Sequence, residues 1–250
     1  MRLANSPIVE AIFDIKVELS DEFQVNELLA FREKVGGKYP NNKPQMEFLG
    51  QLNFEVNLPL EIQSSSSHLG FIFISDDEKK IAQVKLDGFT FSQVKPYQNW
   101  KDFYEEAYKL WQFYVEIAAP KAVKRVALRY INRILIPSAE QINLKDYMRI
   151  LPETPDTFSV TILDYFLRIV VANQEDSNVR AIINQTIPRD DQLDLEKDSI
   201  PLILDIDVFQ ENDLTMDDTE IRNIFENKLR KFRSKIFDES ITDKTRSLFQ

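Results

Sequence analysis

Three arginines recur at every fourth position in one stretch of the sequence. Arg125, Arg129 and Arg133 lie in a run of alternating apolar and polar residues, with Ala127 and Ile131 between them. Side chains along a β-strand point to opposite faces in turn, so residues four apart share a face. Guanidinium groups bind carboxylate or phosphate through paired hydrogen bonds. The spacing therefore predicts a row of anion-binding side chains along one face of a strand.

Acidic residues recur in a similar way in two other stretches. Glu10 and Asp14 share one face of a predicted strand near the start of the chain, and Asp205 and Asp207 share one face of another. Carboxylate oxygens are ligands that Mg²⁺ and Mn²⁺ prefer. One hypothesis is therefore a divalent-metal-dependent enzyme that binds a phosphate or a nucleotide inside a closed antiparallel sheet. Its anion ligands would be Arg125, Arg129 and Arg133, and its metal ligands would be Glu10, Asp14, Asp205 and Asp207.

The first acidic stretch departs from the pattern of one enzyme group that works in this way. Triphosphate-tunnel enzymes carry Glu-x-Glu-x-Lys on their first strand, whereas this sequence has Asp14, Lys16 and Glu18. In the structural interpretation, acids and arginines on solvent faces pair across neighbouring strands, each pair contributing about 0.2–1 kcal/mol. We favour this interpretation. It predicts an open face on which Arg129→Ala changes the free energy of unfolding by less than about 1 kcal/mol.

A third group of charges lies near the end of the chain. Five basic residues fall within a predicted helix that begins near Thr215: Lys228, Arg230, Lys231, Arg233 and Lys235. Cations in the last turns of a helix interact favourably with its dipole, and we favour this interpretation. The alternative is a docking surface for an acidic partner.

The composition excludes several kinds of site. The 250 residues include no cysteine, which rules out disulfides, zinc ribbons, iron–sulfur clusters and thiol nucleophiles. The single histidine, His68, follows the serine run 64–67, which we interpret as a loop entering a strand. None of the five glycines forms a phosphate-binding loop, which argues against dinucleotide-binding and P-loop enzymes. No cofactor is predicted unless the enzyme hypothesis, with its Mg²⁺ or Mn²⁺, holds.

The charge balance bears on the partner and the location. Asp and Glu number 41 against 31 Lys and Arg, which gives a formal net charge of -10. An acidic surface repels phosphate backbones, so we expect no nucleic-acid partner. The first residues do not resemble a signal peptide, and no apolar run approaches the roughly 18 residues of a membrane span. We therefore expect a cytoplasmic protein without a membrane contact.

The elements that would position these residues are strands and helices in alternation. Asp87-Gly88 lies between two alternating runs and predicts a two-residue hairpin turn. Asn99 caps a predicted helix that Pro120 ends. The apolar face of this helix, which we expect to pack on a sheet, carries Trp100, Phe103, Tyr104, Trp111 and Tyr114. Period-two alternation predicts strands at 8–17, 52–58, 69–74, 81–86, 89–94, 123–136, 158–172, 179–187 and 201–209.

This order of elements predicts an α+β fold, in which antiparallel sheets carry long helices packed on one side. The series of strand, helix, several strands and long helix occurs twice. The sheets could therefore form two related halves, 1–120 and 121–250, or a partly closed barrel. No linker divides the halves, since Pro120 falls directly between a helix and a strand. We therefore predict one composite domain that spans residues 1–250.

Three short segments resemble one family of proteins. Residues 6–15 read SPIVEAIFDI, residues 202–209 read LILDIDVF, and residues 236–242, IFDESIT, end a long predicted helix. In these segments the chain is similar to a sporadically distributed family of bacterial and archaeal proteins of comparable length. That family has no established activity, so the resemblance implies an architecture and no substrate. A patchy distribution is typical of mobile genes, including toxin–antitoxin and phage-defence cassettes, and thereby implies an interaction role.

The function that these observations predict is that of a non-catalytic interaction protein in a mobile defence or toxin–antitoxin system. The prediction rests on a sequence without a recognisable nucleophile and base, metal cluster or nucleotide loop. Its partner would be another protein or a second copy of the chain. The metal-dependent enzyme described above is the alternative.

Overall fold

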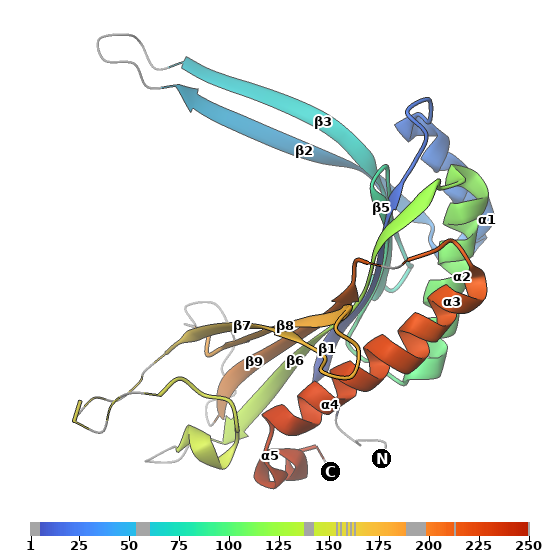
Figure 1. The fold of residues 1–250 in the computed structure, drawn as a ribbon. Helices are drawn as coiled ribbons and strands as arrows, with labels where there is room; N and C mark the ends of the chain where they lie inside the picture. The colour runs from blue at the N-terminus through green and yellow to red at the C-terminus, as the bar shows by residue number, and fades with distance from the viewer. Residues whose placement is uncertain are drawn as a thin grey trace.

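One antiparallel sheet forms the centre of the molecule. The computed structural model describes residues 6–53, 61–137, 143–153, 155, 157–158, 160, 162, 164–188, 199–212 and 214–249, with the backbone alone at 48–53 and 61–65. The sheet has nine strands in the order β2-β3-β4-β5-β1-β6-β9-β8-β7 (Figure 1). The strands are β1 (Ile8–Glu18), β2 (Asn41–Asn53), β3 (Glu61–Ile74), β4 (Lys80–Lys85), β5 (Gly88–Val94), β6 (Ala122–Pro137), β7 (Phe166–Ala172), β8 (Val179–Thr186) and β9 (Ser199–Gln210).

Two long helices lie on the same side of this sheet (Figure 1). The first is α2 (Trp100–Ala118), and the second runs without a break through α3 (Asp218–Asn223), a π-helical segment (Ile224–Leu229) and α4 (Arg230–Ser240). The short helices are α1 (Phe31–Val35) and α5 (Asp243–Ser247), with 3₁₀ turns at Val25–Ala30, Gly36–Lys38 and Leu144–Asp146. The predicted α+β fold with long helices on one side is confirmed. In the described part of the chain, no helix is long and apolar enough to cross a membrane.

The strand order has a regular pattern around its centre. β1 and β6 pair with each other, and each begins one series of strands. From β1 the sheet continues outward through β5, β4, β3 and β2, and from β6 through β9, β8 and β7. Among their described residues, the end strands β2 and β7 do not pair with each other. The sheet is therefore open and does not form a partly closed barrel. In each series the strand that comes last in the sequence, β5 or β9, pairs with the strand that comes first, β1 or β6. A long helix follows it in the chain. Related halves 1–120 and 121–250 would give this pattern, but duplication of the sequence stays a prediction.

The core lies between the sheet and the helices. Alternate residues of β1 from Ala11 to Val17 are buried, as the period-two pattern predicts. Phe13 of β1 stacks on Phe225 of the π-helical segment, with 4.2 Å between the ring centroids. This contact fixes the C-terminal helix against the central strand.

The helix α2 begins where the sequence predicts it. The side-chain oxygen of Asn99 accepts a hydrogen bond from the backbone N–H of Asp102 at 2.9 Å. This cap satisfies a backbone N–H of the first turn. The aromatic face of the helix packs on the sheet, where Trp111 contacts Phe89 of β5. Trp111 in the middle of that face is only 2% exposed.

The predicted hairpin between β4 and β5 is confirmed, but its turn is displaced by one residue. Lys85 pairs with Gly88, so the two turn residues are Leu86 and Asp87. Gly88 already belongs to β5, and a Cβ atom there would lie 2.2 Å from the carbonyl oxygen of Ile15 in β1. Close approach of two backbones, rather than the turn, therefore requires the glycine.

Three predictions along the sheet are wrong in their bounds. β2 begins at Asn41, where the sequence predicts no strand; most of the predicted strand 52–58 lies outside the described residues. The serine run 64–67 lies within β3 and not in a loop. β7 begins at Phe166, later than the predicted residue 158. An end strand such as β2 tolerates Pro44 and many polar residues because it needs hydrogen bonds along one edge only.

Trp111→Ala is expected to lower the free energy of unfolding by about 3–5 kcal/mol, because a buried indole is lost and a cavity remains. Trp100 at the start of the same helix is partly exposed and provides the matched control. Trp100→Ala should cost clearly less. Urea unfolding of both variants measures the difference, and an unchanged midpoint for Trp111→Ala would contradict the burial of its side chain.

Candidate functional site: the uncovered face of the sheet

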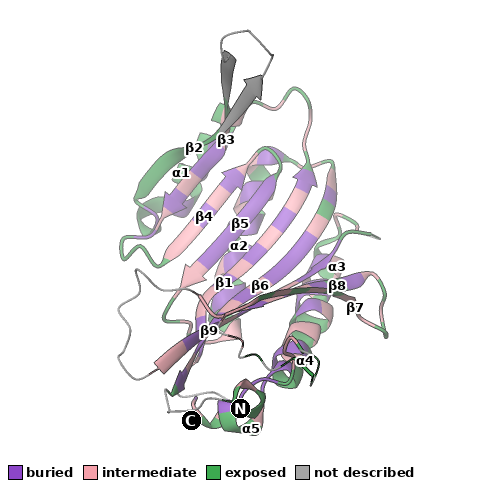
Figure 2. Cartoon of the chain, turned by 90° about the vertical axis from the view of Figure 1, so that its left-hand side faces the viewer, coloured by how far each residue is buried: buried purple, intermediate pink, exposed green. Residues whose placement is uncertain are grey.

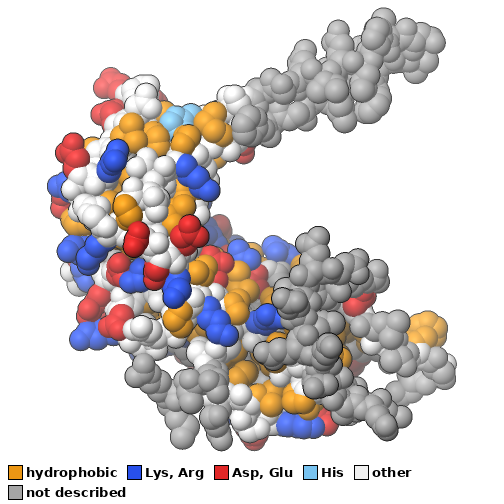
Figure 3. Space-filling model, turned by 180° about the vertical axis from the view of Figure 1, so that it is seen from behind, with side chains coloured by type: hydrophobic (Ala, Val, Ile, Leu, Met, Phe, Trp, Pro, Cys, Tyr) orange, Lys and Arg blue, Asp and Glu red, His pale blue; other side chains and the backbone are white. Residues whose placement is uncertain are grey.

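In the part of the chain that the structure describes, no long helix lies on the side of the sheet opposite α2 and the C-terminal helix, and we call this side the open face (Figure 2). Arg125, Arg129 and Arg133 of β6 lie on this face, with Ala127 and Ile131 between them, as the spacing predicts. Seen from behind, the described surface mixes hydrophobic, basic and acidic side chains (Figure 3). On the open face, Ile12 of β1 and Ile131 of β6 lie among the charged residues of the central strands.

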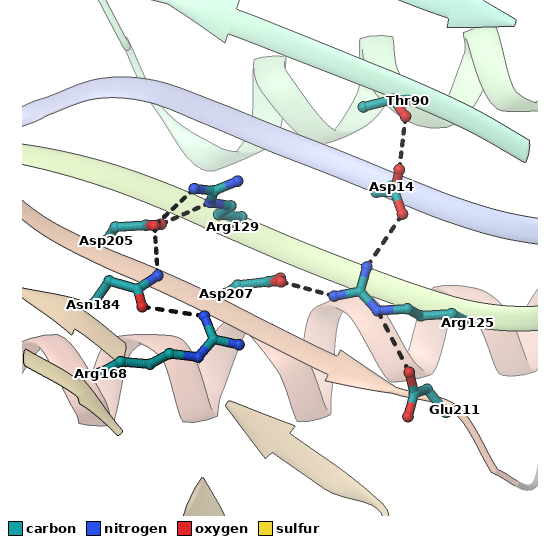
Figure 4. Close-up of polar contacts among 9 residues, drawn as sticks. All are labelled: Asp14, Thr90, Arg125, Arg129, Arg168, Asn184, Asp205, Asp207 and Glu211. Carbon is teal, nitrogen blue, oxygen red and sulfur yellow. Dashed lines mark hydrogen bonds and ion pairs between the residues drawn. The ribbon is translucent and has the colours of Figure 1, made fainter. Parts of the chain in front are cut away.

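Arg125 joins side chains from three strands (Figure 4). Its guanidinium donates hydrogen bonds to Asp14 of β1 at 3.3 Å and to Asp207 of β9 at 2.7 Å. The hydroxyl of Thr90 in β5 donates to Asp14 at 2.6 Å. The guanidinium carbon also lies 4.7 Å from the centroid of the Phe209 ring. One cation therefore bridges carboxylates from two strands, and a third carboxylate, that of Glu211 after β9, lies 4.0 Å from its Nε atom.

Arg129 begins a second network that crosses four strands, β6, β9, β8 and β7 (Figure 4). Its Nε and Nη2 atoms each donate a hydrogen bond to Asp205, both at 2.7 Å. Asn184 donates to the same carboxylate at 3.0 Å, and its side-chain oxygen accepts from Arg168 at 3.4 Å. The hydrogen bonds to Asp205 raise the pKa of the Arg129 guanidinium. This arginine is thereby held as a permanent cation in a two-point ion pair.

The carboxylates of both networks are shielded, although no long helix of the described residues covers the face. The side chain of Asp205 is 9% exposed and that of Asp207 is 18% exposed. Burial raises the pKa of the Asp207 carboxyl above its ordinary value of 3.8, because loss of hydration outweighs the attraction of Arg125. Acids and arginines thus pair across strands, as in the structural interpretation. Their burial is greater than that of simple surface pairs.

Three of the four residues predicted as metal ligands contact arginines instead of one another. Asp14, Asp205 and Asp207 each contact an arginine. Glu10 lies opposite Ile131 and forms no ion pair with a described residue. Among the residues that the structure describes, no group of three or more His, Asp or Glu side chains could hold a metal ion. Guanidinium groups bind the carboxylate oxygens that a metal ion would need.

Arg133 differs from the other two arginines of the row. It forms no ion pair with a described carboxylate, and its Nε atom is buried without a hydrogen-bond partner in the described part of the chain. The predicted anion-binding row therefore consists of two arginines that are paired within the sheet and one, Arg133, that pairs with no described carboxylate.

Two lysines of the C-terminal helix bind the turn between β7 and β8. Lys228 pairs with Asp176 at 2.8 Å, and Lys235 pairs with Glu175 at 3.5 Å. These pairs connect the long helix to the outer strands of the second series. Both cations therefore have partners within the chain.

The two arginines among the predicted docking residues lie over aromatic rings. The guanidinium carbon of Arg230 is 5.1 Å from the ring centroid of Trp100, and that of Arg233 is 4.2 Å from the ring centroid of Tyr130. Lys231 is exposed and forms no ion pair with a described residue. Of the five predicted docking residues, only this one lacks such a contact among the described residues.

Sequence reasoning missed Thr90, Arg168 and Asn184 as members of the networks. Each is a polar residue in a predicted strand, which is its only signal in the sequence. Whether such residues meet depends on which strands are neighbours and in which register they pair. Alternation alone determines neither.

Arg129→Ala is now expected to lower the free energy of unfolding by about 1–2 kcal/mol, more than a solvent-facing pair would. It leaves the shielded carboxylate of Asp205 with Asn184 alone, although solvent screens part of the loss because Arg129 is 42% exposed. Arg168→Ala is the matched control and should cost less than about 0.5 kcal/mol. Urea unfolding compares the two variants, and equal small effects would show that the network does not stabilise the sheet.

Asp207→Asn is expected to alter the dependence of stability on pH. A raised pKa means that the folded state binds a proton more readily than the unfolded state. The contribution of Asp207 to the free energy of unfolding therefore falls as the pH rises from 3.8 through the folded-state pKa. The stability of Asp207→Asn relative to the wild type should be higher at about pH 7 than at about pH 4. Urea unfolding at both pH values tests this, with the exposed Asp76→Asn as control; the opposite trend would contradict it.

Comparisons with known proteins return no relative of this chain. No family model matches it, and no curated protein and no solved structure matches it significantly. The resemblance of its three short segments to the sporadically distributed family therefore stays a prediction, and the function is inferred from the geometry of the open face.

Proposed function

We propose that this chain is a non-catalytic binding protein whose open face receives a protein partner. The observation that carries the proposal is the side of the nine-stranded sheet that no long helix of the described residues covers, on which aliphatic side chains lie between ordered ion pairs. A sheet face left without a covering layer is a common place for a partner, because apolar residues there gain by burial. The resemblance to a sporadically distributed family supports placing this role in a mobile defence or toxin–antitoxin system.

The polar groups of the open face favour binding over catalysis. A general acid or base needs a titrating group that is free to meet a substrate. Asp205 and Asp207 instead accept hydrogen bonds from arginines that hold them in place. Fixed and satisfied polar groups suit recognition, because they lose little conformational entropy on binding.

The composition of the open face favours a protein over a nucleic acid. Ile12, Ile131 and Ile182 lie on it beside the charged networks, and all three are partly exposed. Phosphate backbones are bound mainly by unpaired cations, whereas the two central arginines are already neutralised. Aliphatic side chains among ion pairs resemble the mixture found at protein interfaces.

The test compares the open face with the basic helix. The full chain, Ile131→Lys in the centre of the open face and Lys231→Glu on the C-terminal helix are immobilised and exposed to an extract of the source cells. The retained proteins are quantified, and the best candidate is purified for calorimetry. We expect a partner that binds the wild type and Lys231→Glu equally and binds Ile131→Lys at least about tenfold more weakly.

Thermal unfolding controls for the folding of both variants. Loss of binding in Lys231→Glu alone would assign the partner to the helix and overturn the proposal. Equal retention of every protein by all three chains would also overturn it. Concentration-dependent sedimentation of the wild type that is abolished by Ile131→Lys would identify the partner as a second copy of the chain.

A further inference from the structure

The end strand β7 exposes large apolar side chains to solvent at the edge of the sheet. Leu167, Ile169 and Val171 are partly buried towards the helices, whereas the residues between them point to the open face. On that face Phe166 is 69% exposed and Val170 is 60% exposed. Large apolar side chains therefore lie on both sides of this end strand, although a strand at a sheet edge normally carries polar residues on its solvent side.

The other end of the sheet is built differently. β2 contains Pro44, which has no backbone N–H to donate, and its pairing with β3 is interrupted by a bulge between Gln45 and Met46. Both features hinder the addition of a further strand. β7 has neither, since its register with β8 is continuous from Phe166 to Ala172. No described strand pairs with the outer edge of β7, so of the two end strands β7 is the one whose backbone could accept another strand.

The charges beside β7 indicate what such a strand would carry. Arg168 lies between Phe166 and Val170 on the open face. Within the described network it donates a hydrogen bond to Asn184. Neither Arg168 nor Arg180, which pairs with Ala172 across the strands, forms an ion pair with a described carboxylate. Asp205, the carboxylate of this network, is already bound at both oxygens. A chain with a net charge of -10 thus exposes two guanidinium groups at this corner.

On β7 and β8 the charged side chains of the open face are both basic, Arg168 and Arg180, whereas Asp205 and Asp207 of the neighbouring β9 already pair with arginines of β6. This local excess of positive charge favours an acidic occupant.

We infer that β7 accepts an extended segment of the partner protein by strand addition, with an acidic residue opposite Arg168 and apolar residues opposite Phe166 and Val170. The inference rests on the proposed function and specifies its partner. Residues directly opposite each other in paired strands point to the same face, and alternate residues along a strand are about 6.6 Å apart. The required segment therefore reads apolar, any residue, acidic, any residue, apolar. Backbone hydrogen bonds provide affinity in this mode, and the alternate side chains provide specificity.

The test uses random 12-residue peptides displayed on phage and selected on the immobilised full chain. We expect enriched peptides to carry Asp or Glu with apolar residues two positions away on both sides. A synthetic copy should bind Arg168→Glu at least about tenfold more weakly than the wild type. Replacing the peptide's acid by Lys should restore binding to Arg168→Glu. Lys43→Glu in β2 is the matched control at the other edge and should leave the affinity unchanged.

Hydrogen exchange locates the bound peptide, because strand addition should slow exchange at the backbone amides of β7. Protection at β2 or only in the centre of the sheet would overturn the inference. So would enrichment of peptides without acids, failure to enrich any peptide, or an affinity that Arg168→Glu does not change. If binding is lost in Ile131→Lys but not in Arg168→Glu, the inference fails and the proposed function stands. If a single-stranded oligonucleotide, and no peptide, binds through Arg168, both fail.

Discussion

The antiparallel pairing of β1 with β6 joins the two series of strands and sets both faces of the sheet. Its register places Phe13 opposite Leu128 on the side of the helices and Asp14 opposite Ala127 on the open face. From there Asp14 reaches Arg125, two residues along β6. A slip of one residue would move Phe13 away from Phe225 and turn the acid into the core. The continuity of the core and the charged networks are thus consequences of the same pairing.

The predictable part of the fold is the part that depends on local periodicity. Alternation in β1 and β6 identifies buried and open faces correctly, and the cap at Asn99 marks the start of α2. The sequence pattern does not predict the polar strand β2. This segment is a strand because of its place at the edge of the sheet and not because of its residue types. Gly88 is predicted as a turn residue, but it is needed because its backbone lies close to that of β1. This approach follows from the pairing of β5 with β1, which the local sequence does not show.

The sequence predicts which residues share the open face better than it predicts which of their side chains contact one another. The arginine row and the pair Asp205 and Asp207 follow from strand parity. The two-point pairing of Arg129 with Asp205 requires the neighbourhood of β6 and β9, whose sequences lie far apart. Asn184 joins them only because β8 follows β9 in the sheet. Long-range register therefore decides whether the acids could bind a metal ion or an arginine, and here they bind arginines.

The attachment of the C-terminal helix has a consequence for the mechanics of the molecule. Near β1 the helix is held by ring stacking, which does not weaken with dissolved ions. At the turn between β7 and β8 it is held by Lys228 and Lys235 through ion pairs that are partly or largely exposed to solvent. Rising ionic strength screens such pairs and leaves the aromatic contact intact. Salt would thus loosen the outer strands of the second series while the centre stays rigid, and local opening would begin at β7.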